Sequence, residues 1–236
     1  MPADETRFGL ERGMGRFDGQ VAIVVGGGRG VGLGVAMRIG REGACIVLVE
    51  ADRVMGERAA DMLDAEGIEG RLLLGDPADP AAAKWAATTA KLVWGRVDVV
   101  VYADPMGDVS GPLHAVGPKI LDALYRNDVR GPLQYCQAVI PAMMERGYGR
   151  IVTVAKDIGL QGGARRSARS ATQAALIGLT KAVAMSVVDT GIFVNVVAVS
   201  DGAEDEEGVV SAVCWLASRE CSFTTGAVFE VGGGQP

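Results

Sequence analysis

The sequence has few residues of the kinds that bind metals, form disulfides or fill a core with rings. It contains one histidine, His114, and four cysteines that form no CxxC pair, so we expect no transition-metal site. Aromatic residues make up only 5%, which predicts a core of Val, Ala, Leu and Ile, and Trp85 and Trp94 are expected on a helix face against it. The cysteines are predicted to be free, buried thiols of a protein in the reducing cytoplasm: Cys45, Cys136, Cys214 and Cys221.

Long apolar runs and an excess of positive charge are also missing. No apolar stretch approaches the roughly 18 residues that would span a membrane. The N-terminus is polar and lacks the apolar region of a signal peptide, so we expect a cytoplasmic location. The formal net charge is −6 and the sequence pI about 4.9, which gives no electrostatic attraction to a nucleic acid.

Short apolar runs and helix-type segments alternate along nearly the whole chain. Residues 1–17 are expected to form a flexible lead, and residues 18–236 a single domain without linkers or repeats. Runs typical of strands cover residues 20–28, 44–50, 71–76, 97–103, 150–155, 192–199 and 227–231. Helices are expected over residues 30–43, 53–67, 80–95, 119–147, 163–190 and 206–218. This alternation predicts an α/β fold with a single doubly wound parallel sheet, Rossmann-like, with helices on both faces.

A glycine-rich turn joins the first strand to the first helix. In VGGGRGVG, the glycines Gly26, Gly30 and Gly32 have GxxxGxG spacing, which lets a pyrophosphate approach the N-terminus of the helix. Glu50 ends the next strand, where a carboxylate can accept hydrogen bonds from ribose hydroxyls and repel the 2′-phosphate of NADP. We therefore expect NAD as the cofactor. The alternative is that the glycines serve packing alone and the site is vestigial.

Several separate segments resemble the short-chain dehydrogenase/reductase family, in the family's order. They are the opening strand with its glycine turn, the fifth strand GRIVTVA, the helix SATQAALIGLTKAVA and the C-terminal SFTTGAVFEVGGG. The resemblance implies the doubly wound fold, a nicotinamide cofactor, and assembly into dimers or tetramers through the helices at 118–146 and 163–190. By the same resemblance, Asp76 is the acid that contacts adenine.

The positions that carry catalysis in this family hold other residues here. The family's asparagine, serine, tyrosine and lysine correspond to Asp128, Lys156, Arg169 and Gln173. In the family, the tyrosine exchanges a proton with the substrate and the lysine lowers the tyrosine's pKa. An arginine keeps its proton at neutral pH, and a neutral glutamine cannot lower a neighbour's pKa. The substrate-covering segment is also cut to DGAEDEEG, residues 201–208. Alcohol–ketone redox by this chain alone is therefore not expected.

Three functions are consistent with these substitutions. The first is the non-catalytic subunit of a hetero-oligomeric NAD-dependent alcohol or hydroxyacyl dehydrogenase. In it the chain would join an active paralogue in a heterotetramer; a homo-oligomer is the alternative assembly. The second is a non-redox lyase, isomerase or dehydratase that uses Lys156 and Arg169 on an anionic substrate, with Asp157, Arg165 and Arg166 around the same pocket. The third is a regulatory protein that senses NAD.

Overall fold

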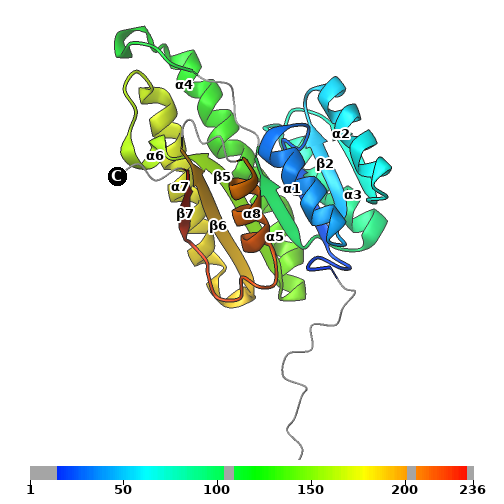
Figure 1. The fold of residues 1–236 in the computed structure, drawn as a ribbon. Helices are drawn as coiled ribbons and strands as arrows, with labels where there is room; N and C mark the ends of the chain where they lie inside the picture. The colour runs from blue at the N-terminus through cyan, green and yellow to red at the C-terminus, as the bar shows by residue number, and fades with distance from the viewer. Residues whose placement is uncertain (1–14, 104–108, 201–205, 233–236) are drawn as a thin grey trace, which may run out of the picture.

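The described residues form one parallel sheet covered by helices on both faces (Figure 1). The structure, a computed structural model, describes residues 15–103, 109–200 and 206–232. Their seven strands lie in the order β3-β2-β1-β4-β5-β6-β7, with every pairing parallel. The strands are β1 Val21–Val25, β2 Cys45–Glu50, β3 Gly70–Leu74, β4 Val99–Tyr102, β5 Gly149–Lys156, β6 Ile192–Val199 and β7 Val228–Val231. This confirms the predicted doubly wound fold.

The α-helices follow the strands almost in alternation. They are α1 Gly30–Arg41, α2 Arg53–Ala65, α3 Pro80–Trp94, α4 Pro118–Tyr125, α5 Gly131–Arg146, α6 Ile158–Gln161, α7 Ser167–Ser186 and α8 Glu206–Ala217. Three short helical segments of other types are η2 Leu113–Ala115, η3 Arg126–Arg130 and η4 Val188–Thr190. None of the helices within the described ranges is long and apolar enough to cross a membrane.

Alternate residues of the central strands face two separate helical layers. In β1, Ala22 and Val24 belong to a core shared with α1, α2 and α8, whereas Ile23 and Val25 pack with α3, α5 and α7. Burial on both faces explains why these strands read as continuous apolar runs. The strand order reverses between β1 and β4, so the connections after these strands diverge and leave a crevice at their carboxyl ends.

The long helix predicted over residues 119–147 is interrupted by a π-helical turn. α4 and α5 flank η3, in which the Gly131 N–H donates to the carbonyl oxygen of Arg126, five residues earlier. Pro132 has no N–H to continue this pattern toward Asn127. The Tyr102 hydroxyl donates to the Asn127 carbonyl oxygen instead, at 3.1 Å. The break therefore depends on Pro132 and on a strand residue 25 positions away from Asn127, neither of which helix periodicity reveals.

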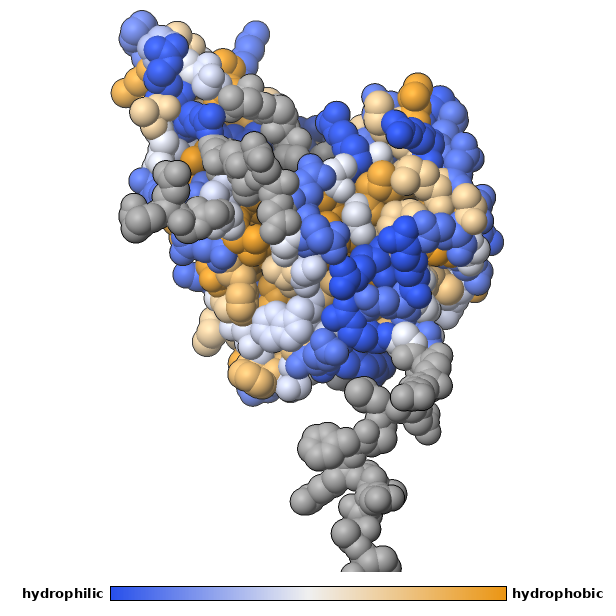
Figure 2. Space-filling view, in the orientation of Figure 1, coloured by the Kyte–Doolittle hydropathy of each residue, from blue (hydrophilic) through white to orange (hydrophobic). Residues whose placement is uncertain are grey.

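The last three residues of the expected N-terminal lead, 15–17, belong to the packed domain. Residues 1–14 lie outside the described residues, whereas the Phe17 side chain is fully buried. Arg16 donates to both carboxylate oxygens of Glu42, at 2.5 and 2.8 Å, and Arg38 donates to the same carboxylate at 3.1 Å. Figure 2 shows hydrophilic side chains gathered over this part of α1. These ion pairs hold Arg16 against Glu42 at the end of α1.

The third helix packs on the sheet through small residues and Trp94 rather than through Trp85. Trp85 is 51% exposed, which corrects the expectation that it packs against the sheet. α3 turns four alanines inward instead: Ala82, Ala83, Ala86 and Ala90. The short alanine side chains bring α3 close to the sheet and leave the indole of Trp85 on the outer face.

Candidate active site

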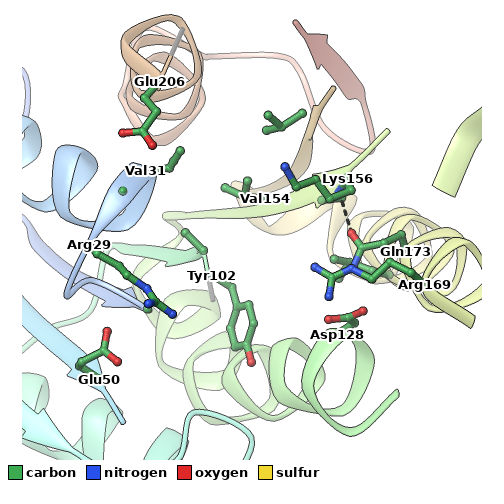
Figure 3. Close-up of a pocket in the computed structure, with 16 residues that line it drawn as sticks. Arg29, Val31, Glu50, Tyr102, Asp128, Val154, Lys156, Arg169, Gln173 and Glu206 are labelled. Atoms are coloured by element: carbon green, nitrogen blue, oxygen red, sulfur yellow. Dashed lines mark hydrogen bonds between the residues drawn. The ribbon is translucent and has the colours of Figure 1, made fainter. Parts of the chain in front are cut away.

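A cavity of about 380 Å³ opens at the carboxyl ends of the central strands, in the crevice at the point of strand reversal (Figure 3). Its lining brings together the glycine turn, Glu50 and all four substituted positions that the sequence singled out. Of the predicted cofactor-binding residues, Gly26, Gly30 and Glu50 line the cavity, whereas Gly32 and Asp76 do not. Segments far apart in sequence therefore meet in one site, as the topology of a doubly wound sheet requires.

The glycine turn keeps its shape through a close backbone crossing. Gly26 has a φ of +73°, and its N–H donates to the carbonyl oxygen of Val49 at 2.9 Å. A Cβ atom on Gly32 would lie 2.1 Å from the Gly26 carbonyl oxygen, so only glycine permits the crossing. α1 begins at Gly30 with no side-chain cap from Arg29 and no acid in its first turn. Its positive end therefore faces the cavity and suits an anionic group such as a phosphate.

Glu50 lies beside the glycine turn, at the end of β2. Its Oε2 accepts a hydrogen bond from the Gly28 N–H at 3.0 Å, and its Oε1 accepts from the N–H groups of Ala51 and Asp52 at 3.0 and 3.1 Å. A Cβ atom on Gly28 would lie only 2.5 Å from Oε2, so a larger residue there would require the Glu50 carboxylate to shift. The carboxylate is held at the edge of the cavity, where its remaining lone pairs can accept hydrogen bonds from sugar hydroxyls.

Asp76, the predicted adenine contact, is engaged by a neighbouring cation. Its Oδ2 lies 2.7 Å from Arg126 Nη2, and its Oδ1 accepts a hydrogen bond from the Ala78 N–H at 2.8 Å. Partial burial opposes ionisation of this carboxyl, but the hydrogen bonds from Arg126 and Ala78 outweigh it and lower the pKa. Contact with adenine stays a prediction, and any base bound there would meet Asp76 together with Arg126.

Two of the substituted positions are buried and tied into a polar network. Asp128 is 3% exposed and Arg169 is 4% exposed. The Thr172 hydroxyl donates to Asp128 Oδ2 at 2.6 Å, and the Asn127 side-chain amide donates to Asp128 Oδ1 at 3.4 Å. These bonds connect η3 to α7. Figure 3 shows the Arg169 and Asp128 side chains pointing into the same cavity.

The other two substituted positions are joined directly. The Gln173 side chain is 3% exposed, and its Oε1 accepts a hydrogen bond from the backbone N–H of Lys156 at 2.6 Å. This bond ties α7 to the end of β5. The Lys156 side chain extends into the cavity (Figure 3). The glutamine amide therefore accepts a backbone hydrogen bond, at the position that the sequence resemblance aligned with the family's lysine.

Three polar side chains line the cavity without having been predicted as site residues: Arg29, Tyr102 and Glu206. Arg29 stands inside the glycine turn, so its place in the sequence was an available signal. Glu206 reaches the cavity because α8 packs beside α1, and Glu207 next to it pairs with Arg38 of α1 at 2.7 Å. No local sequence pattern indicates that packing.

Two arginines expected around this cavity lie elsewhere. Arg165 and Arg166 line a separate cavity of about 210 Å³, together with residues from 109–120. Arg165 has a φ of +63°, and its carbonyl oxygen accepts a hydrogen bond from the Gly111 N–H at 2.8 Å. The bend before α7 turns both residues away from Lys156. Of the cations in the predicted anionic-substrate site, Lys156 and Arg169 share the main cavity.

Comparisons with known proteins agree with this architecture. A family model described as short chain dehydrogenase matches residues 20–202. The 2-dehydro-3-deoxy-L-rhamnonate dehydrogenase (NAD(+)) of Sphingomonas sp. (strain SKA58) is 30% identical over 250 residues, covering 94% of this chain and 97% of that protein. The (2S)-[(R)-hydroxy(phenyl)methyl]succinyl-CoA dehydrogenase subunit BbsC of Thauera aromatica is 27% identical over 239 residues, covering 92% and 95%.

Two solved structures share the fold. NAD+-bound xylitol dehydrogenase matches with a TM-score of 0.84 at 22% identity, covering 92% of this chain and 99% of that one. Levodione reductase matches with a TM-score of 0.86 at 23% identity, covering 93% and 98%. With the family model spanning most of the sheet and the cavity, the chain belongs to the short-chain dehydrogenase family.

Proposed function

We propose that this chain is a non-catalytic, NAD-binding subunit that supports an active paralogue in a hetero-oligomeric dehydrogenase. The observation that carries the proposal is the hydrogen bond from the Lys156 N–H to Gln173 Oε1. A lysine at position 173 could not accept this bond, because an ammonium group has no acceptor atom. Gln173 thus binds the backbone at the end of β5, and it carries no charge that could lower the pKa of a neighbouring proton donor.

The chemistry of carbonyl reduction supports the same conclusion. Hydride addition leaves an alkoxide that needs a proton, and the reverse reaction needs a base. Arg169, at the tyrosine position, holds its proton at neutral pH and can only stabilise an anion. The Tyr102 hydroxyl donates to the Asn127 carbonyl oxygen in the π-helical turn, so it supports the backbone. The substituted tyrosine and lysine positions together offer no proton exchange.

The connection that covers the substrate in the resembling family is short here. β6 ends at Val199 and α8 begins at Glu206, so only residues 200–205 connect them. The loss of a covering segment together with the proton donor supports a subunit that no longer processes substrate.

The surface of α7 supports assembly with another chain of the same fold. Its outer face carries exposed small residues, Ala171, Ala174 and Gly178, and a Cβ atom added to Gly178 would meet nothing within 4 Å. Exposed apolar side chains also lie on α4, α5 and α7: Ile120, Leu121, Tyr125, Met144 and Met185. Small residues let a partner helix approach closely. The Thauera aromatica relative is named as a dehydrogenase subunit, which favours the same arrangement.

A second apolar surface lies at the β7 edge of the sheet. Figure 2 shows apolar residues gathered over β7 and the segment before it. Phe223 is 84% exposed, and Trp215 and Phe229 form a partly exposed edge-to-face pair with centroids 5.5 Å apart. Among the described strands, β7 pairs with β6 alone. An edge strand with apolar neighbours favours coverage by a partner subunit.

The retained glycine turn and Glu50 support NAD as the ligand. The relative from Sphingomonas carries NAD(+) in its name, and the xylitol dehydrogenase of the same fold is NAD+-bound. In this chain, the uncapped N-terminus of α1 would hold the pyrophosphate and Glu50 the adenosine ribose. NAD bound here would supply hydride chemistry in the family's manner, which the substituted positions do not complete with a proton.

The test is expression of the chain alone and together with an intact paralogue from its own source. Alone, it should show no NAD-dependent turnover of secondary alcohols or hydroxyacyl thioesters. With the paralogue it should co-purify as one species by native mass measurement. Gly178→Arg on the outer face of α7 should abolish co-purification, whereas Thr88→Arg, equally exposed on α3, should not. Turnover by the chain alone, or a paralogue that never co-purifies, would contradict the proposal.

One observation favours a second function. Lys156 and Arg169 point into the same cavity, where an amine and a guanidinium could bind an anionic substrate for a lyase, isomerase or dehydratase reaction (Figure 3). If such an activity is found, Lys156→Met should abolish it while leaving NAD affinity unchanged. An activity that survives this substitution would remove the lysine from the chemistry.

A further inference from the structure

An acidic side chain from α8 reaches the end of α1 at which a phosphate would bind. Glu206 lines the cavity, and its Oε1 would lie 3.8 Å from a Cβ atom added to Gly30, the first residue of α1. Figure 3 shows the Glu206 carboxylate directed toward the glycine turn beside Val31. The positive end of α1 has no capping side chain of its own. Glu206 therefore supplies a negative charge where the helix dipole attracts one.

We propose that the Glu206 carboxylate occupies the pyrophosphate position of the glycine turn and sets a low affinity for dinucleotides, which must displace it to bind. The inference rests on the proposed function insofar as the cavity is a dinucleotide site. A carboxylate and a phosphate compete for the same N–H groups and dipole. They also repel each other when both are present, because like charges a few ångströms apart raise the energy of the complex.

The surrounding charges do not cancel this repulsion. Arg29 is the cation on the same turn, but Figure 3 shows its side chain extending away from Glu206 toward the Glu50 side of the cavity. The Lys156 backbone N–H donates to Gln173, and in Figure 3 the Lys156 side chain stands across the cavity from Glu206, with Val31 between them. Glu207, next in sequence, pairs with Arg38 on the outer surface at 2.7 Å. Two neighbouring acids of one helix thus differ in their surroundings, since Glu206 faces the phosphate position and Glu207 pairs with Arg38 on the outer surface.

This difference gives a matched experiment on the purified chain. Calorimetric titration with ADP should show a dissociation constant about tenfold lower for Glu206→Gln than for the parent chain at low salt. Glu207→Gln removes the same charge one residue away and should change ADP affinity by less than about twofold. Adenosine, which has no phosphate, should bind all three proteins equally.

The gain for Glu206→Gln should also shrink as salt rises, because Glu206 is exposed and its field is screened. Equal gains for adenosine and ADP would mean that the glutamine changes cavity shape, and would overturn the proposal. So would equal effects of Glu206→Gln and Glu207→Gln, or no measurable ADP binding to Glu206→Gln. None of these outcomes depends on turnover or on a paralogue, so they are separate from the test of the subunit function.

Discussion

Gln173 Oε1 and the backbone N–H of Lys156 are 2.6 Å apart, and this bond joins the middle of α7 to the end of β5. It uses the position at which the family's chemistry would need a cation. In the same cavity, Thr172 and Asp128 join α7 to η3. Both bonds join secondary-structure elements around the cavity, at positions that the sequence resemblance aligned with catalytic residues of the family.

Removing the Gln173 amide should destabilise the fold. Gln173→Ala leaves the Lys156 N–H without this acceptor in a buried environment, so the free energy of unfolding should fall by about 1–3 kcal/mol. Urea unfolding followed by circular dichroism measures the loss. Lys181→Ala, an exposed change on the same helix, should stay within about 0.5 kcal/mol of the parent. An equally stable Gln173→Ala would show that the bond has no structural role.

Removing the Tyr102 hydroxyl should loosen the π-helical turn. In Tyr102→Phe, the Asn127 carbonyl oxygen loses its donor, and Pro132 cannot replace it, so unfolding should become easier by about 1–2 kcal/mol. Amide hydrogen exchange should accelerate around residues 126–131. Tyr125→Phe, on the exposed side of α4, is the control and should change neither quantity. Unchanged exchange in Tyr102→Phe would separate the tyrosine from the π-helical turn.

Much of the fold was predictable from local patterns. Strands buried on both faces read as continuous apolar runs, and glycines mark the turns that follow them. The strand containing Val21–Val25 and the turn at Gly26 were predicted on these grounds, and the structure contains both. The π-helical form of the interruption at η3 was not predicted. It depends on the Tyr102 hydroxyl, which belongs to a strand distant in sequence, and on the missing N–H of Pro132.

The site also combines features that strand ends predict with features that depend on distant contacts. The topology of a parallel sheet brings Glu50 and Lys156 to one edge, so their meeting could be predicted from strand ends. The pairing of Asp76 with Arg126 and the approach of Glu206 to Gly30 depend on how helices from separate parts of the chain pack. Long flexible side chains take their partners from that packing, and no spacing in the sequence encodes it.

The ion cluster at the end of α1 should make stability depend on pH. Partial burial alone would raise the pKa of Glu42, but hydrogen bonds from Arg16 and Arg38 outweigh it and lower the pKa. A depressed pKa in the folded state contributes stability above the unfolded value of about 4.3, and this contribution is lost as pH falls through the folded pKa. Glu42→Gln should therefore be less stable than the parent at pH 7.

The stability difference between Glu42→Gln and the parent should shrink steadily below about pH 4. Thermal unfolding at several pH values measures it. Glu57→Gln removes an exposed pair with Arg53 and should cost less than about 0.5 kcal/mol at any pH. A Glu42→Gln deficit that persists undiminished at pH 3 would assign its cause to packing instead of charge.

Glu50 should determine the preference between NADH and NADPH if the cavity binds a dinucleotide as proposed. Its carboxylate is fixed by three backbone N–H groups and cannot swing away from a 2′-phosphate without breaking them. The parent chain should therefore bind NADH more tightly than NADPH. Glu50→Ala removes an acceptor for the ribose hydroxyls, so NADH affinity should fall by about tenfold.

NADPH affinity should rise in the same Glu50→Ala variant, because the repulsion disappears while Arg29 remains in the cavity lining to attract the 2′-phosphate. The double variant Glu50→Ala/Arg29→Gln should lose this gain. Titration of each reduced cofactor by its fluorescence measures the four dissociation constants, with Asp61→Ala on the exposed face of α2 as the control. Equal losses for NADH and NADPH in Glu50→Ala would mean that the carboxylate only supports the Gly28 backbone and does not contact the ribose.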